Sequence, residues 1–338
     1  MFFKISILAV GVLVALGSAA RRPGATYLLI PVGARQGGMA YAFTAIADDA
    51  SANYYNAAGL AFLDSPQITG TYLGYLLGLH QDMHHVYVAA AYPFGKSCVG
   101  LDFIYFTPGK TSVVNPDGTY LGEYVAWRIA PKISYTRRFN EKTALGLSWK
   151  FIKQQDCMYW WWDPWLDSNG LDRGGTGVSF AFDFSALYRI LPNLSVGIGF
   201  HNIGPDIVYT ESGASDPLSW TLKSGVAYVP IDNDKIAVLI SGELTKVLVG
   251  MFADEEKSFW QHVGYEFDEA WKAIGLEVTI HRIVALRGGF FYDKEGVREG
   301  FTFGIGLSYA GISLDIGIDE HVYEFETENR RISLSYKF

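Results

Sequence analysis

The feature that most constrains this chain is a strict alternation of apolar and polar residues near its carboxyl end. From Phe301 to Tyr309 the odd positions are aromatic or aliphatic, and the residues between them are Thr, Gly or Ser. The alternation returns in the opposite phase after Gly311, and it appears once more from Arg331 to Phe338. A period of two is typical of β-strands with one apolar face and one polar or small face. The carboxyl end of the chain is therefore predicted to be a series of such strands.

The same pattern extends backwards and predicts fourteen strands. They cover residues 66–79, 82–94, 97–106, 121–138, 142–153, 174–191, 193–202, 217–230, 234–247, 274–281, 283–293, 299–310, 311–319 and 331–338. Most of them have about nine residues or more, which is enough for a tilted strand to cross a bilayer. No segment of the mature chain reaches the roughly eighteen apolar residues that a membrane helix needs.

The predicted connections alternate between tight turns and longer segments. Apart from a short connection at His80-Gln81, the longer ones cover residues 107–120, 154–173, 203–216, 248–273, 294–298 and 320–330. Outer-membrane barrels have short periplasmic turns and longer external loops. The sequence therefore predicts an all-β fold, a 14-stranded antiparallel transmembrane β-barrel over residues 66–338, in a bacterial outer membrane with lipid around it.

Charged residues fall on the face of these strands that is predicted to point into the lumen. The inward phase contains Asp102, Arg128, Lys132, Lys150, Asp183, Lys223, Glu243, Glu277 and Arg287. Both signs of charge are present, so we expect ion pairs across a filled or narrow lumen. If the turn is centred on Arg282, Glu277 lies directly across from Arg287. We predict that these two side chains contact each other.

The first twenty residues have the features of an export signal. One cation, Lys4, precedes an apolar run and then the small residues Gly17-Ser18-Ala19-Ala20, which is typical of a cleaved signal peptide at residues 1–20. The formal net charge of −8 makes nucleic-acid binding an unexpected function, because phosphate neutralisation needs clustered Lys and Arg. A content of 49% apolar residues excludes a disordered chain.

Residues 21–65 do not alternate and consist mainly of small residues. We expect this segment to enter the barrel as a plug, because its large apolar side chains need burial; the alternative is a flexible periplasmic leader. A helical turn is predicted to start after Asp48 or Asp49, since both are good N-caps. The motif residues of the segment are Gly33, Arg35, Asp48, Asn53, Asn56, Gly59 and Leu60.

This amino-terminal motif, followed by fourteen strands, resembles the PorV/PorQ family of FadL-like outer-membrane β-barrel proteins. The stretch Gly275-Leu276-Glu277, continuing to Val284 through Gly289, is similar to a late hairpin of that family. Ala57 stands where the family motif has a proline. The resemblance implies a non-enzymatic barrel linked to type IX protein secretion, which receives exported cargo proteins and passes them to other secretion-system subunits. Its alternative implication is a FadL-like channel for long-chain fatty acids or other hydrophobic small molecules.

The chain ends on Tyr336 and Phe338. A final alternating strand with this ending resembles the signal that the barrel-assembly machinery reads, and the alternative is an ordinary edge strand. That machinery is therefore an expected partner.

Two loop segments stand out from the strands. Four tryptophans, Trp160, Trp161, Trp162 and Trp165, form either an aromatic belt at the lipid headgroups or a clamp for a hydrophobic ligand or a passing protein. Residues 254–273 predict an amphipathic helix across the outer mouth, because Trp260, Val263, Phe267 and Trp271 recur at three- and four-residue spacing.

The remaining reactive residues predict no chemistry. His80, Asp82, His84 and His85 could suggest a metal site, but His84 and His85 point to opposite faces of a strand, so we instead expect solvated histidines near the barrel rim. Cys98 and Cys157 are expected at opposite ends of the barrel, which predicts two free thiols. No catalytic set has recognisable spacing, and we expect neither an enzyme nor a cofactor.

Overall fold

The computed structural model describes residues 22–77, 82–114, 117–156, 174–251, 259–294, 296, 298–322 and 325–338. The predicted signal peptide, the tryptophans at 160–162 and 165, Cys157 and His80 lie outside the described residues.

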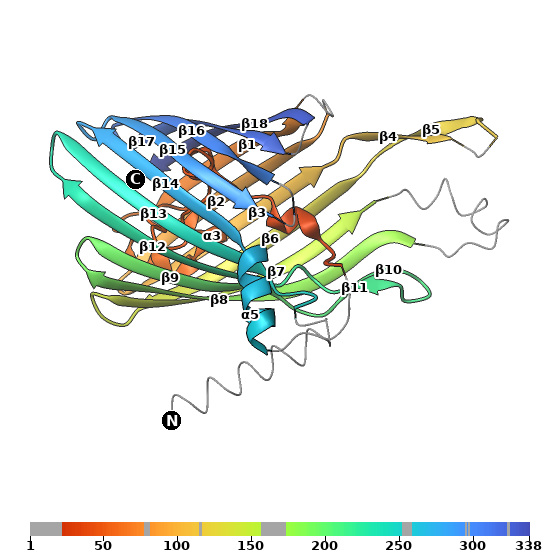
Figure 1. The fold of residues 1–338 in the computed structure, drawn as a ribbon, viewed down its shortest axis with the longest axis horizontal. Helices are drawn as coiled ribbons and strands as arrows, with labels where there is room; N and C mark the ends of the chain where they lie inside the picture. Colours follow the sequence, from red (N-terminus) through yellow and green to blue (C-terminus); the bar gives the residue numbers. More distant parts are fainter. Residues whose placement is uncertain are drawn as a thin grey trace.

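Fourteen antiparallel strands form one closed wall (Figure 1). They are β1 (Gln67–Leu77), β2 (His84–Phe94), β3 (Ser97–Thr107), β6 (Trp127–Arg138), β7 (Thr143–Gln155), β8 (Gly174–Leu191), β9 (Leu194–Ile203), β12 (Thr221–Asp232), β13 (Ile236–Val247), β14 (Trp271–Ile280), β15 (Val284–Asp293), β16 (Arg298–Tyr309), β17 (Ile312–Val322) and β18 (Phe325–Lys337). Each strand pairs with the next along the wall, and β1 pairs with β18, so the sheet has no free edge in the membrane. The predicted 14-stranded antiparallel barrel is confirmed.

The other elements lie at one end of the barrel, which we call the outer end. They are the hairpin of β4 (Lys110–Val114) and β5 (Tyr120–Val125), the short strands β10 (Ile207–Thr210) and β11 (Ser215–Asp216), and helix α5 (Phe259–Glu269). Figure 1 shows β4 and β5 projecting well beyond the wall. We call the opposite end, where the tight turns lie, the turn end.

Several predicted boundaries at the outer end are wrong, and the predicted loop 203–216 contains β10 and β11. The predicted loop 107–120 and the start of the predicted strand 121–138 instead contain the β4–β5 hairpin, and β18 begins at Phe325 instead of residue 331. The predicted helix 254–273 is described only as Phe259–Glu269, and Trp271 belongs to β14, where it pairs with Thr245. Strands that extend beyond the bilayer need no apolar outer face, so the period-two signal that marks a strand is lost there.

The two faces of the wall differ as the alternation predicts. Outward side chains such as Leu101, Phe103 and Trp149 are 40–52% exposed, while Asp102 and Lys150 on the inward phase are 7% exposed. Among the described residues, no helix combines the length and the apolar character needed to cross a membrane.

The amino-terminal segment, residues 22–65, lies inside the wall (Figure 1). It contains η1 (Thr26–Leu29), α2 (Ala34–Gly37), α3 (Ala52–Tyr55) and η2 (Ala57–Phe62). Its Gly24 forms a bridge with Leu218 at the outer end, and Arg189 stacks on Phe62 at the turn end, 3.8 Å from the ring centroid. The segment therefore spans the interior from one end to the other.

Inward-facing glycines of the wall allow the segment to approach closely. A Cβ atom on Gly197 of β9 would lie 2.2 Å from the carbonyl oxygen of Thr44, and one on Gly317 of β17 would lie 2.4 Å from that of Ala34. Only glycine leaves room for a second backbone at these positions.

Candidate functional site in the barrel interior

The interior contacts between the amino-terminal segment and the wall form the candidate site. They fall into three groups of polar residues and one small cavity. Most of the lumen charges predicted from the sequence belong to one of these three groups.

The first group is a charge cluster on β3, β6, β7 and β8. Lys132 Nζ lies 3.1 Å from Asp102 and 3.6 Å from Asp183, and Lys150 Nζ lies 3.1 Å from Asp183. All four side chains are at most 9% exposed. Lys132 also donates to the carbonyl oxygen of Asn53, so the cluster binds the amino-terminal segment as well as joining four strands. Buried charges of this kind are stable only when paired, as they are here.

The second group is centred on Glu277 of β14. Arg287 Nε donates to Glu277 at 2.6 Å, which confirms the predicted contact, and Arg287 also binds Asp315 at 2.7 Å. Arg35 of the segment donates to both Glu277 oxygens at 2.9 Å and pairs with Asp48 at 2.6 Å. Glu277 therefore joins the segment to the wall.

The third group holds the middle of the segment. Glu243 of β13 accepts hydrogen bonds from the backbone N–H groups of Phe43 at 2.9 Å and Thr44 at 2.8 Å. Lys223 of β12 lies over the rings of Tyr54 and Tyr55, with Nζ 4.4 and 4.7 Å from their centroids. These are charge-assisted and cation–π contacts in a desolvated setting.

Asn56 shapes the turn between α3 and η2. Its Nδ2 donates to the carbonyl oxygens of Thr44 and Ala186, and its Oδ1 accepts from the N–H of Ala58. The predicted helical turn after Asp49 is present: the Asp49 carboxylate accepts from the N–H of Ser51 at 2.8 Å, its carbonyl oxygen accepts from the N–H of Ala52 at 3.0 Å, and α3 follows from Ala52.

The other motif residues act through shape. Gly33 has a φ of 86°, and a Cβ there would lie 1.8 Å from Oε1 of Gln36. A Cβ on Gly59 would lie 2.1 Å from the Ala47 carbonyl oxygen, and Leu60 is fully buried.

Sequence reasoning missed several interior groups. Arg331 is 2% exposed, binds Asp319 and lies over the ring of Tyr41, whose hydroxyl also bonds Asp319. His201 lies 3.6 Å from Asp183. The alternation placed Asp315, Asp319 and Arg331 in the polar phase of their strands, which is the signal that could have identified them. Arg128, in contrast, lies at the outer rim, where it pairs with Asp156 at 2.8 Å and is 23% exposed.

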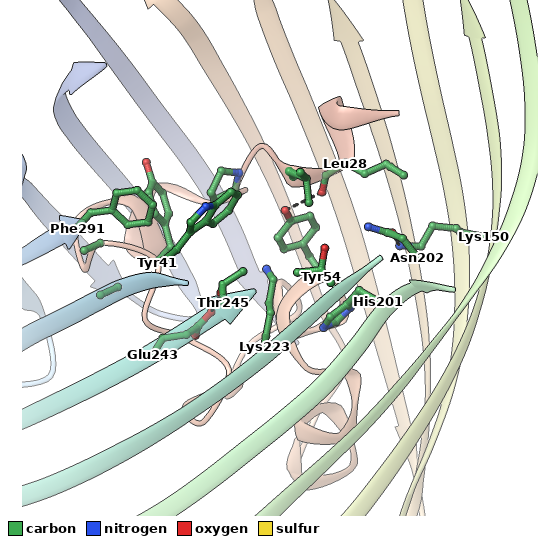
Figure 2. Close-up of a pocket in the computed structure, with 16 residues that line it drawn as sticks. Leu28, Tyr41, Tyr54, Lys150, His201, Asn202, Lys223, Glu243, Thr245 and Phe291 are labelled. Carbon is green, nitrogen blue, oxygen red and sulfur yellow. Dashed lines mark hydrogen bonds between the residues drawn. The ribbon is translucent and has the colours of Figure 1, made fainter. Parts of the chain in front are cut away.

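A cavity separates the segment from β7, β9 and β12–β15 (Figure 2). Tyr41 and Phe291 lie on one side, Lys150 and Asn202 on the other, and Tyr54 between them. It offers about 30 Å³ of space that a water molecule can enter. A water needs roughly 10–15 Å³ of such space, so about two waters fit.

The cavity is mixed in polarity and not a continuous apolar pocket. Leu28 and Phe291 face it together with Lys223 and Glu243. The Tyr54 hydroxyl donates to the carbonyl oxygen of Leu28 at 2.9 Å. The lining supplies hydrogen bonds and charges, and within it the Thr245 hydroxyl donates to Glu243 at 3.3 Å.

The structure places some of the histidines and cysteines that the sequence analysis considered. His84 stacks on Tyr72, which is 51% exposed, so the rings of His84 and His85 lie on opposite faces as predicted. The expectation of a solvated side chain is wrong for His85, which is buried against Phe106 because it faces the filled interior. Within the described part of the chain, no group of three or more His, Cys, Asp or Glu side chains could hold a metal ion. Cys98 is a buried free thiol on β3.

Tyr336 and Phe338 lie on the outward face at the turn end. They are 40% and 69% exposed, and their rings form an edge-to-face pair at 4.7 Å.

Several solved structures are similar to this chain in fold. The toluene transporter TbuX of Ralstonia pickettii has a TM-score of 0.58 at 12% identity, over 92% of this chain and all of that chain. The toluene transporter TodX of P. putida has a TM-score of 0.56 at 12% identity, over 91% and 98%. A FadL homologue of Pseudomonas aeruginosa has a TM-score of 0.48 at 12% identity, over 91% and 98%.

A comparison with curated proteins gave no match. The family described as type IX secretion system protein PorV matches residues 19–254, which is more than half of the chain. The family and the similar structures are secretion and transport barrels. This chain therefore belongs to the PorV family of type IX secretion system proteins and is an outer-membrane β-barrel whose fold is similar to that of TbuX and TodX.

Proposed function

We propose that this barrel receives exported proteins at its outer end while residues 22–65 act as a plug that keeps the lumen closed. The observation that supports this most directly is that the segment passes through the whole interior and leaves beside it cavities of only about 30 and 20 Å³, with a pocket of about 370 Å³ at the outer end. A polypeptide cannot cross such a space. Cargo proteins and secretion-system subunits therefore bind outside the lumen.

The outer end offers surfaces suited to protein binding. In the β4–β5 hairpin, Val114, Tyr120 and Val125 are 41–59% exposed, and the two strands pair only with each other. Unpaired strand edges can accept an extended segment of another chain.

Helix α5 adds a second apolar surface. Lys246 of β13 pairs with Glu266 at 2.5 Å and Glu269 at 3.1 Å, so the polar face of the helix meets the barrel. Trp260 and Phe267 on the other face are 78% and 55% exposed. Large exposed aromatic side chains are typical of binding surfaces.

A deletion strain tests the proposal. In a strain that lacks the gene for this barrel, we expect secreted cargo to accumulate in the periplasm instead of reaching the surface or medium. A plasmid copy of the gene should restore secretion. Immunoblots of the periplasm and the medium measure this. Normal secretion in the deletion strain would refute the proposal.

The second candidate is a channel for long-chain fatty acids or other hydrophobic compounds. It is supported by the fold shared with toluene transporters and by the apolar part of the cavity lining, Leu28 and Phe291. Such a channel requires the plug to move, since Lys223 and Glu243 line the same space. Uptake of a labelled long-chain fatty acid by the deletion strain distinguishes the two functions, because only a channel predicts reduced uptake with normal secretion.

A further inference from the structure

The outer face of β12–β15 contains a groove in the lipid-facing wall. Strand pairing aligns Val226, Gly242, Ile274 and Phe290 in one lateral row across the four strands. Gly242 is the only member of this row without a side chain. The row therefore has a gap between Val226 and Ile274, which are 45% and 63% exposed.

The gap is real space and not a site of backbone crowding. A Cβ atom on Gly242 would lie 3.7 Å from Cγ1 of Val226 and 3.9 Å from the carbonyl oxygen of Ala273, which are ordinary contact distances. The groove around it has a volume of about 680 Å³. This is within the roughly 300–1,000 Å³ of small-molecule sites. Its other outward side chains include Leu244 and Phe290.

One long side of the groove is aromatic. Phe290 and Phe301 of the neighbouring strand β16 form an edge-to-face pair with ring centroids 5.2 Å apart. Phe301 is 63% exposed. These rings extend the apolar surface beside the gap, so a flexible hydrocarbon chain in the groove would contact it over several methylenes.

The outer end of the groove carries a positive charge. Lys272 and Tyr292 form the next lateral pair, and Lys272 is the second residue of β14 after α5. Lys272 Nζ donates to the carbonyl oxygens of Phe267 at 2.8 Å, Asp268 at 3.0 Å and Ala270 at 3.3 Å, so it is held at the carboxyl end of the helix and offers a headgroup its charge. A lysine at the end of a membrane strand lies at the level of the lipid headgroups.

We propose that this groove is a binding site for one acyl chain of an anionic membrane lipid, with the headgroup beside Lys272. We infer a lipid as the occupant because the groove opens on the apolar band of the wall. The bilayer supplies acyl chains and no water at this level. The single fixed cation at its outer end favours an anionic headgroup over a zwitterionic one. The site lies on the opposite face of the wall from the interior cavity, and its outer end at Lys272 adjoins helix α5.

Substitutions at Gly242 test the groove directly. The full barrel is assembled in nanodiscs that contain equal amounts of phosphatidylglycerol and phosphatidylcholine, and native mass spectrometry counts the lipids that stay bound after release. We expect Gly242→Leu, which fills the gap, to reduce retained phosphatidylglycerol roughly tenfold. Gly242→Ala should give an intermediate loss, and it provides the test if the leucine variant does not fold.

Gly70→Leu on β1 is the matched control. Gly70 is also an outward glycine of the wall, and nothing lies within 4 Å of its Cβ position, but it is not part of the groove. We expect this variant to retain lipid as the unmodified protein does, and Lys272→Gln to lose the preference for phosphatidylglycerol over phosphatidylcholine. Equal retention by the Gly242 variants and the unmodified protein, or equal loss by Gly70→Leu, would overturn the proposal. Secretion and uptake are not read in this experiment, so its outcome is independent of the proposed function.

Discussion

Glu277 on β14 and Arg287 on β15 are directly opposite each other, and Arg287 Nε donates to Glu277 Oε2 at 2.6 Å. Their side chains are only 9% and 5% exposed. The other Glu277 oxygen accepts from Arg35, which lies 242 residues away in the sequence. One carboxylate therefore connects two wall strands and the amino-terminal segment.

Removing this carboxylate should destabilise the barrel. Glu277→Ala leaves two arginines in the interior without their shared partner, and breaking a buried ion pair costs about 3–5 kcal/mol. We expect a loss of this size in the free energy of unfolding, measured by urea titration of the protein in lipid vesicles. Arg282→Ala is the control, because its partner Asp232 and Arg282 are about 60% exposed at the turn end. That variant should lose at most about 1 kcal/mol, and equal losses in the two variants would contradict the assignment.

Removing the amino-terminal segment should open the lumen. We expect a variant lacking residues 25–63 to conduct ions in planar bilayers, whereas the complete protein conducts little or nothing. Gly197→Leu should act in the same direction, because its side chain would collide with the carbonyl oxygen of Thr44 and displace the segment.

The control for the lumen experiment is Gly70→Leu, which adds the same side chain on the outward face. Closed channels in both the deletion variant and Gly197→Leu, with the barrel folded, would show that residues 22–65 are not a plug.

Cys98 should be unreactive in the folded barrel. Its side chain is completely buried on β3. In a Cys157→Ser background, we expect a membrane-impermeant maleimide to label the protein only after denaturation, as followed by mass spectrometry. Labelling of the folded protein at a rate similar to that of the unfolded chain would contradict the burial of this residue.

The exposed aromatic face of α5 should matter for secretion and not for stability. We expect Trp260→Ser combined with Phe267→Ser to reduce cargo secretion severalfold while the free energy of unfolding stays within about 0.5 kcal/mol, as is usual for surface substitutions. Tyr309→Ser is a matched control, since Tyr309 is 79% exposed but lies at the turn end. If the α5 variant secretes normally, the helix is not a cargo surface.

The terminal phenylalanine should affect assembly more than stability. Phe338 is 69% exposed, so its ring contributes little burial to the folded barrel. We expect Phe338→Ala to lower the amount of assembled protein in the outer membrane, measured as the heat-modifiable band on gels, with little change in the unfolding of the protein that does assemble. Unchanged assembly would favour an ordinary edge strand.

The sequence predicted the wall well where the strands cross the membrane. Leu101 is apolar and Asp102 is charged because one faces lipid and the other faces the interior. Neighbouring residues of a membrane strand therefore differ in polarity, and this difference can be read from the sequence. The pairing of Glu277 with Arg287 followed from the same alternation and a tight turn. The prediction failed at β4–β5 and at the start of β18, where both faces can be polar.

The sequence by itself determined the number of wall strands, which residues of each strand face lipid or the interior, and the family. These depend on local periodicity and on short motifs. Only the tertiary structure decided how the interior is filled. Arg35 meets Glu277, Glu243 meets the backbone of Phe43, and Arg331 meets Tyr41 because the wall closes between β1 and β18 around the segment. Contacts between residues two hundred or more positions apart depend on the register of every strand between them, and no local pattern in the chain specifies such partners.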